Sequence, residues 1–171
     1  PRIAEGTLRV LPTLEGKPLK AERIVITVRD GGRVVGVADA ALSVRIPDAK
    51  LWSPQNPSLY EITMELFDGE ELIDRVESYA AMREIGTIRG PAGQIRMTLN
   101  GKVVFHYGPL DQGWWPDGLL TPPSDAAMRF DVDYLKKSGF NMIRKHIKVE
   151  SRRYYAHCDR IGMMVWQDMP S

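Results

Sequence analysis

Polar and aromatic side chains follow three short apolar segments in the second half of the chain. These segments lie near residues 106–110, at 140–144 and at 163–166. Aromatic rings cover apolar C–H faces, whereas carboxylate, guanidinium and imidazole groups bond hydroxyls at fixed angles. This combination suits the binding of a sugar. The candidate binding residues are Asp111, Trp114, Trp115, Arg144, His146 and Asp168.

Each candidate also has a structural interpretation that the sequence leaves open. Trp114 and Trp115 could fill a junction between two parts of the chain, and Arg144 and Asp168 could form a structural ion pair. A lone histidine such as His146 is more often structural than catalytic. All six nevertheless follow the C-terminal ends of predicted strands, where barrel enzymes carry their functional groups, and this convergence favours a binding site.

Two predicted helices separate the three apolar segments. The first begins at Ser124, a good N-cap residue, and ends before Gly139. The second is predicted over residues 150–161 and ends before Gly162. Apolar runs that alternate with helices are typical of a parallel sheet with a covered outer face. The predicted order from about residue 106 is therefore β-α-β-α-β.

A dinucleotide-binding sheet is the main alternative for such an order. It requires a glycine-rich turn after its first strand, where backbone approaches a pyrophosphate. The segment that follows Leu110 instead contains Trp114, Trp115 and Pro116. These bulky residues argue against the alternative.

The first half of the chain has the two-residue period of antiparallel strands. Residues 60–66 alternate apolar and polar side chains, as do residues 42–46. The sequences Asp-Gly-Gly at 30–32, Asp-Gly at 68–69 and Asn-Gly at 100–101 predict tight hairpins. Several short strands spaced by such turns predict an immunoglobulin-like antiparallel β-sandwich over residues 1–90.

Composition excludes several classes of protein. The chain has 23 basic and 22 acidic residues without a charged block, which argues against nucleic acid as a partner. Its apolar runs are too short to cross a membrane. It has a single cysteine, Cys158, which we expect to be buried and inert, and it lacks the HExxH, P-loop and GxSxG motifs. We expect no metal site and no cofactor.

Four motifs resemble those of glycoside hydrolase family 2, the group of β-galactosidases, β-glucuronidases and β-mannosidases. They occur in the family's order: LWSPQNPSLY at 51–60, LNGK at 99–102, GFNMIR at 139–144, and HCDRIG at 157–162 followed by VWQD at 165–168. The resemblance implies a retaining exo-glycosidase that hydrolyses O-glycosyl bonds of β-linked glycans in carbohydrate catabolism. It also implies that residues 91–171 form the first β-α-β-α-β part of a TIM (β/α)8 barrel.

The resemblance further implies that the catalytic carboxylates lie outside this chain. In the family, both are glutamates, the acid/base in an Asn-Glu pair after the fourth barrel strand and the nucleophile near the seventh. The predicted strands here reach only the third. Glu150, the one glutamate in this part, matches neither motif. We therefore expect an internal fragment of the enzyme, inactive on its own, with no catalytic residue.

Some positions depart from the family pattern. Better-known members end the second strand in R-x-x-H, whereas His146 follows Arg144 by two residues and Ile147 takes the third place. The usual F-G-x-R end of the sandwich is AAMR at 80–83. The loop at 111–115 is DQGWW in place of a histidine-rich loop, which weakens any assignment of galactose as the substrate.

A non-catalytic carbohydrate-binding or interaction module is the alternative function. In either case the expected partner is a carbohydrate. We also expect self-association, because a barrel that stops after three strands has an uncovered edge. Bacterial cytoplasm and a periplasmic or secreted location fit the sequence equally.

Overall fold

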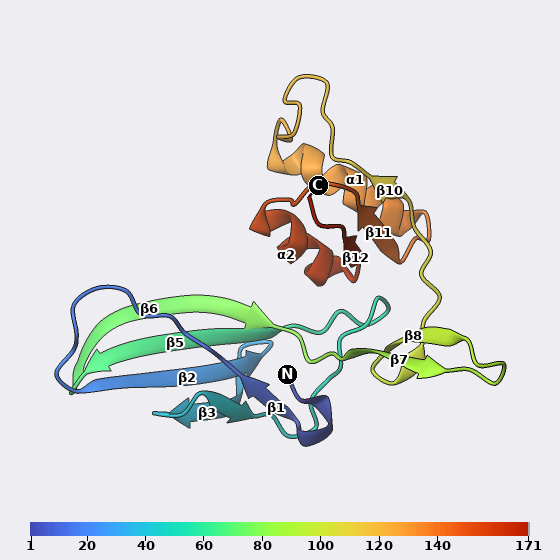
Figure 1. Ribbon diagram of the computed structural model, residues 1–171. Helices are drawn as coiled ribbons and strands as arrows, with labels where there is room; N and C mark the ends of the chain where they lie inside the picture. Colours follow the sequence, from blue (N-terminus) through green and yellow to red (C-terminus); the bar gives the residue numbers. More distant parts are fainter. Residues whose placement is uncertain (171) are drawn as a thin grey trace. The chain divides into compact units, whose positions relative to one another are not determined.

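The computed structural model describes residues 1–170, which form two compact units (Figure 1). The first consists of Pro1–Trp52, Ser58–Thr87 and Thr98–Lys102. The second consists of Ser53–Pro57, Ile88–Met97 and the chain from Val103 onward. Most of the regular structure is antiparallel β-sheet, and helices are few. Within the described residues, none of the helices has the length and apolar character needed to cross a membrane.

The first unit is built on a four-stranded antiparallel sheet. Its order is β3-β2-β5-β6, formed by β2 (Glu22–Asp30), β3 (Arg33–Asp39), β5 (Tyr60–Asp68) and β6 (Glu71–Ala80). Gly31 and Gly32 lie between β2 and β3 with φ of 56° and 81°, and Gly69 follows β5 with φ of 63°. These positive values confirm the predicted hairpins, because glycine adopts them without a steric penalty.

A short second pair of strands contributes to the core of the first unit. After a 3-10 turn, η1 (Ile3–Glu5), strand β1 (Thr7–Arg9) pairs antiparallel with β4 (Ser43–Arg45). Burial of each large side chain in this core contributes about 1.5–3 kcal/mol. The buried residues are Leu8, Ile26, Val28, Ala38, Val44, Ile46, Tyr60, Ile62 and Met82.

One polar residue interrupts the alternation predicted for residues 60–66. Thr63 is buried, although the alternation predicts a polar, outward-facing side chain at this position. The Arg29 guanidinium donates a hydrogen bond of 2.9 Å to the Thr63 hydroxyl. This bond satisfies the hydroxyl, and a buried polar group needs such a partner.

The predicted hairpin at Asn100-Gly101 is confirmed. It joins β8 to β9 in the sheet β7-β8-β9, whose strands are β7 (Ile85–Arg89), β8 (Ile95–Leu99) and β9 (Lys102–Val103). Asn100 and Gly101 have φ of 52° and 75°, as a type I′ turn requires. The Asn100 side chain also accepts a bond from the Glu84 amide and donates one to the Trp52 carbonyl, both at 3.0 Å.

The second unit contains a parallel sheet and two helices. Its strands, in the order β10-β11-β12, are β10 (Leu110–Asp111), β11 (Met142–Lys145) and β12 (Met164–Gln167). Helix α1 (Asp125–Lys137) lies between β10 and β11 in the chain, and α2 (Arg152–Ile161) between β11 and β12. Figure 1 shows both helices beside this sheet. The chain order β-α-β-α-β is as predicted.

The helix ends follow the sequence signals. The Ser124 hydroxyl accepts a bond from the Ala127 amide, and Gly139 follows α1 with φ of 88°. Gly162 ends α2 with φ of 77°. Helix α2 begins two residues later than predicted, because Ser151 has the extended backbone of an N-cap residue, with φ of −64° and ψ of 154°.

Strand β10 is shorter than the predicted segment at 106–110. Pro109 has no amide hydrogen and cannot donate to a ladder. The segment still lies along β11: the Arg144 amide donates to the Pro109 carbonyl, and the Tyr107 amide donates to the Asn141 side chain. Asn141 thus bonds this segment, and β11 itself begins at Met142, two residues later than predicted.

The helices cover one face of the parallel sheet. Their shared core consists of Met128, Val132, Ile143, Tyr154, Cys158 and Met163. Burial raises the pKa of the Cys158 thiol to about 12. Because the thiolate is the reactive form, this thiol is inert at neutral pH, as the sequence predicts.

Candidate functional site

The three parallel strands bring their C-terminal ends to one edge of the sheet. Asp111 ends β10 beside Lys145 of β11, and Lys145 in turn lies beside Gln167 of β12. The predicted site residues lie at these three strand ends or in the segments that follow them. Successive side chains of a strand point to opposite faces, so they divide between the helix-covered face and the uncovered one.

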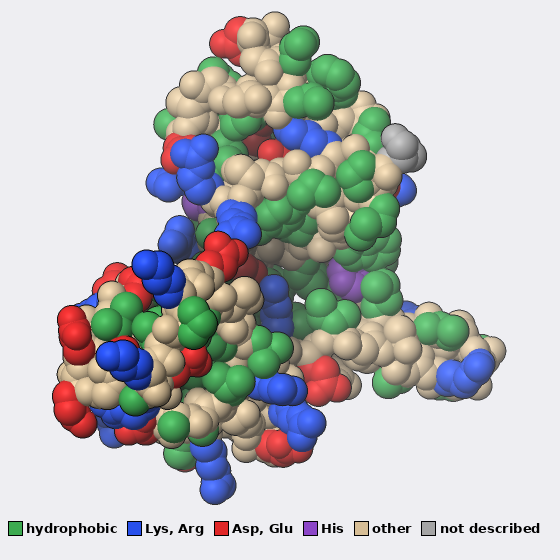
Figure 2. Space-filling model, turned by 60° about the vertical axis from the view of Figure 1, so that its left-hand side comes forward, with side chains coloured by type: hydrophobic (Ala, Val, Ile, Leu, Met, Phe, Trp, Pro, Cys, Tyr) green, Lys and Arg blue, Asp and Glu red, His purple; other side chains and the backbone are tan. Residues whose placement is uncertain are grey.

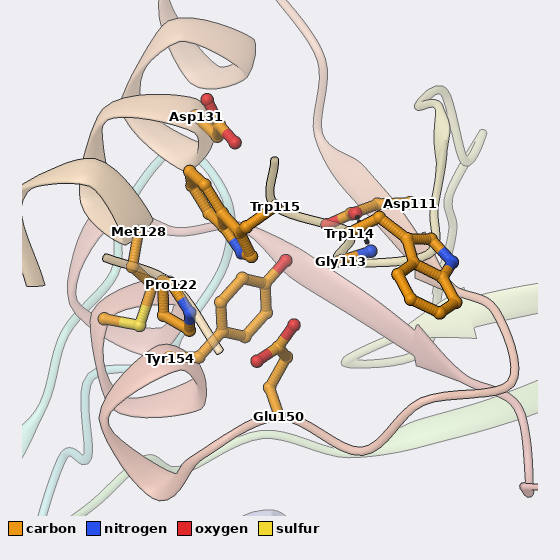
Figure 3. Close-up of a pocket in the computed structure, with 9 residues that line it drawn as sticks. All are labelled: Asp111, Gly113, Trp114, Trp115, Pro122, Met128, Asp131, Glu150 and Tyr154. Carbon is orange, nitrogen blue, oxygen red and sulfur yellow. Dashed lines mark hydrogen bonds between the residues drawn. The ribbon is translucent and has the colours of Figure 1, made fainter. Parts of the chain in front are cut away.

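Three of the predicted residues line a small pocket on the helix side. Asp111 ends β10, and Trp114 and Trp115 come from the loop that follows it (Figure 3). The pocket has a volume of about 40 Å³. Its other lining residues are Gly113, Pro122, Met128, Asp131, Glu150 and Tyr154. The two indoles differ, because Trp114 is 59% exposed whereas Trp115 is partly buried.

Arg144 and Asp168 form a bidentate ion pair on the uncovered face. The Arg144 Nε and Nη2 atoms lie 3.2 Å and 2.8 Å from the two Asp168 oxygens. Trp166 is the partner of Arg144 in the ladder, and its ring lies 5.3 Å from the His106 ring. Sequence reasoning proposed this ion pair as an alternative to sugar contact; it missed Trp166 and His106, although the two-residue period would place Trp166 beside Asp168.

His146 belongs to the group that follows β11. Its Nδ1 lies 3.0 Å from the Gln112 Nε2, and its amide donates to the Asp111 carbonyl. The pKa of the Asp168 carboxyl is lowered, chiefly by its hydrogen bond with Arg144 and to a lesser extent by His146. The structure therefore joins Arg144 directly to Asp168, whereas the His146 ring bonds Gln112.

Substitution of Arg144 by glutamine should raise the pKa of Asp168 toward its ordinary value of 3.8. The depressed pKa means that the pair stabilises the fold above pH 3.8 and that this contribution is lost as pH falls through the folded-state pKa. Carboxyl ¹³C NMR titration measures the change. Arg153→Gln removes a different pair, with Asp125, and should leave Asp168 unaffected. An unchanged pKa in Arg144→Gln would contradict this assignment.

A buried charge cluster supports the loop after β10, and sequence reasoning missed it. The Lys145 ammonium is fully buried and lies 2.8 Å from both Asp111 Oδ2 and Glu150 Oε1. The Lys148 ammonium lies 2.8 Å from the same Glu150 oxygen. Two cations thus face two carboxylates. Ile143 and Lys145 share a strand face, which was a signal that Lys145 points toward the helices.

Gly113 lies directly against this cluster. Its amide donates to Asp111 Oδ1 at 2.7 Å, and its carbonyl accepts from Lys148 at 3.0 Å. A Cβ at this position would lie 2.6 Å from Glu150 Oε1, and φ is +66°. Glycine is therefore required here, both by conformation and by space.

Ile147 has a left-handed backbone with φ of 56°. This conformation costs about 1–2 kcal/mol for a residue with a Cβ. Such strain persists only where the surroundings fix the chain. The bonds that Lys145 and Lys148 make on either side of Ile147 fix it here.

Tyr154 places a polar atom in the pocket. Its hydroxyl is buried and has no hydrogen-bond partner within residues 1–170. The pKa of the Tyr154 hydroxyl is raised, chiefly by burial, so this hydroxyl stays protonated. Burial also raises the pKa of the Asp131 carboxyl, with a further contribution from the charge of Asp111. In the described part of the chain, no three His, Cys, Asp or Glu side chains gather as a metal site would require.

The chain is similar in sequence to several known proteins. Residues 10–83 match the family model described as glycosyl hydrolases family 2. A beta-galactosidase from Halalkalibacterium halodurans is 28% identical, over 98% of this chain and 17% of that protein. Beta-galactosidase 2 of Enterobacter cloacae is 30% identical over 82% of this chain and 14% of that protein. A putative beta-glucuronidase from Formosa agariphila is 27% identical over 77% of this chain and 12% of that protein.

Solved structures share the fold. An FMN-binding beta-glucuronidase from Facaelibacterium prausnitzii superposes with a TM-score of 0.81 at 24% identity, covering 98% of this chain and 26% of that one. A beta-glycosidase from Bacteroides vulgatus gives a TM-score of 0.73 at 22% identity, covering 93% of this chain and 22% of that one. The chain spans only 12% to 17% of the length of the three curated relatives.

Proposed function

We propose, from the premise that this chain belongs to glycosyl hydrolase family 2, that it is part of a longer retaining exo-glycosidase acting on β-linked glycans. The observation that carries the proposal is the set of relatives, which are family 2 galactosidases and glucuronidases matched over most of this chain. The substrate class is accordingly a β-glycoside. The catalytic acid/base and nucleophile belong to segments outside residues 1–171.

In this proposal, residues 1–90 form an immunoglobulin-like sandwich and residues 91–171 the first part of a TIM barrel. The antiparallel sheets and common core of the first unit support the sandwich. The parallel order β10-β11-β12, with α1 and α2 packed on one face, supports the barrel. The uncovered sheet face would then become the inner wall of the barrel.

Arg144, His146 and Asp168 would provide the polar side of a sugar subsite. The guanidinium and carboxylate are already held in a planar bidentate pair, a geometry that can exchange one partner for sugar hydroxyls. Trp114 would offer its exposed ring to the apolar face of a sugar. Asp111 and Trp115 line the pocket behind this loop and would shape it.

Glu150 is unsuited to be a catalytic carboxylate. One of its oxygens is bonded to two ammonium groups, and its side chain is 7% exposed. A retaining glycosidase needs two carboxyl groups about 5–5.5 Å apart that reach the glycosidic bond. The buried position of Glu150 supports the proposal that the catalytic pair lies elsewhere.

Hydrolysis of a panel of aryl β-glycosides tests the function. A longer protein that contains this chain should cleave at least one of the galactoside, glucuronide or mannoside substrates, and the 171-residue chain should cleave none. Glycan binding by the longer protein without cleavage of any substrate would favour a non-catalytic binding module instead.

We also expect the isolated chain to self-associate through the edges of its parallel sheet. Strands β10 and β12 are edges, and Leu110 and Trp166 are 51% and 39% exposed. Unpaired edges template pairing with another chain. Light scattering should give a dimer mass, and Leu110→Lys should shift it toward the monomer. A monodisperse monomer with one cooperative melt would contradict this expectation.

A further inference from the structure

We propose that Glu150 is a positioning residue, which holds the loop at 111–115 in the conformation that presents Trp114 to the glycan. The inference rests on the proposed function for the glycan and on the charge cluster for the loop. Glu150 does not touch the substrate in this account. It acts through Lys145 and Lys148, which carry its effect to the loop.

Glu150 is connected to the loop through two lysines. Lys145 bonds Asp111, at the start of the loop, and Lys148 bonds the Gly113 carbonyl, in its middle. Both lysines share a single oxygen of Glu150. Glu150 therefore bonds both of the lysines that hold the loop.

The two lysines carry charges that are shielded from solvent. Lys145 is fully buried and the Lys148 side chain is only 10% exposed, so neither ammonium has bulk solvent to replace a lost partner. Without the Glu150 charge, Asp111 alone would face two cations. The cluster would relax by moving a lysine outward, and each such movement breaks a contact with the loop.

The loop fits closely against the cluster at Gly113. Gly113 is held through both its amide and its carbonyl, and it leaves no room for a side chain. Trp114 is the next residue, so the direction of its indole follows from the backbone of Gly113. Figure 3 shows Asp111, Gly113 and Trp114 on one side of the pocket, and the Glu150 carboxylate lies so close to Gly113 that a Cβ there would be 2.6 Å from it.

Whether Glu150 holds the loop can be tested without any assay of activity. In the 171-residue chain, Glu150→Gln should speed hydrogen exchange of the backbone amides at 112–115 by at least about tenfold. A factor of this size is typical of the coupling between two sites in a protein. Lys148→Gln, which retains the Lys145–Glu150 pair, should act in the same direction. Asp125→Asn is the matched control, since it removes an exposed carboxylate bonded to Arg153, and it should leave these amides unchanged.

Unchanged exchange at 112–115 in both folded variants would overturn the proposal. If Glu150→Gln fails to fold, Lys148→Gln decides. In the longer enzyme, Glu150→Gln should raise KM about tenfold with kcat within about twofold, because binding and not chemistry is affected. A fall in kcat alone would also contradict the proposal. If the unmodified longer protein cleaves no glycoside, the proposed function fails, and the exchange experiment still decides whether Glu150 holds the loop.

Discussion

Replacement of Lys145 by methionine is expected to lower the free energy of unfolding by about 3–5 kcal/mol. Methionine fills a similar volume, so the loss arises from charge. Asp111 and Glu150 would be left beside a buried apolar side chain, and Lys148 would have to compensate for both. The contact of the Lys145 ammonium with the Tyr154 ring, 5.1 Å from its centre, would also be lost. Urea denaturation followed by circular dichroism measures the change.

Lys137→Met is the matched control for this substitution. Lys137 also lies in the second unit, at the end of α1, and is exposed. Its replacement should change stability by no more than about 0.5 kcal/mol. Equal effects of the two substitutions would show that the cluster around Lys145 contributes nothing specific.

Replacement of Gly108 by alanine should be nearly as damaging. A Cβ at this position would lie 1.6 Å from the Met142 carbonyl oxygen. The obstacle is backbone, which cannot turn aside as a flexible side chain can. The segment before β10 would have to separate from β11, and we expect a loss of about 3 kcal/mol, the upper part of the usual range for overpacking. Thermal denaturation and exchange of the amides of β11 report this separation.

Gly139→Ala separates this steric effect from backbone strain. Gly139 has φ of 88°, but a methyl group at this position would meet open space, with no obstructing atom within 4 Å. Its replacement should cost about 1–2 kcal/mol, the penalty of a left-handed conformation alone. A cost for Gly108→Ala below that of Gly139→Ala would contradict the close approach of Gly108 to Met142.

Local signals predicted most of the secondary structure. The Gly31-Gly32 turn, the Asn100-Gly101 turn and the Ser124 cap depend only on neighbouring atoms, and each has the predicted geometry. The effect of Pro109, in contrast, could not be predicted from its sequence neighbours alone. Its missing amide shortens β10, an effect that depends on which strand lies beside it.

The candidate site was harder to predict because its residues divide between two sheet faces. Strand alternation separates Arg144 from Lys145, although they are adjacent in sequence. The Arg144–Asp168 pair was among the alternatives, but the cluster of Lys145, Lys148 and Glu150 was not. Charged residues are usually exposed, and only the ion pairs that these three make in the folded chain reveal that they are buried. The roles proposed for the six binding residues remain predictions.

The central claim is that this chain forms the non-catalytic side of a glycosidase active site. Covalent trapping tests it most directly: the longer protein is treated with an activated 2-deoxy-2-fluoro β-glycoside of its preferred sugar, and the labelled peptide is identified by mass spectrometry. A retaining enzyme forms a glycosyl ester on its nucleophile, and the fluorine slows its hydrolysis. The account predicts a label on a glutamate outside residues 1–171. A label on any residue within this chain would contradict it.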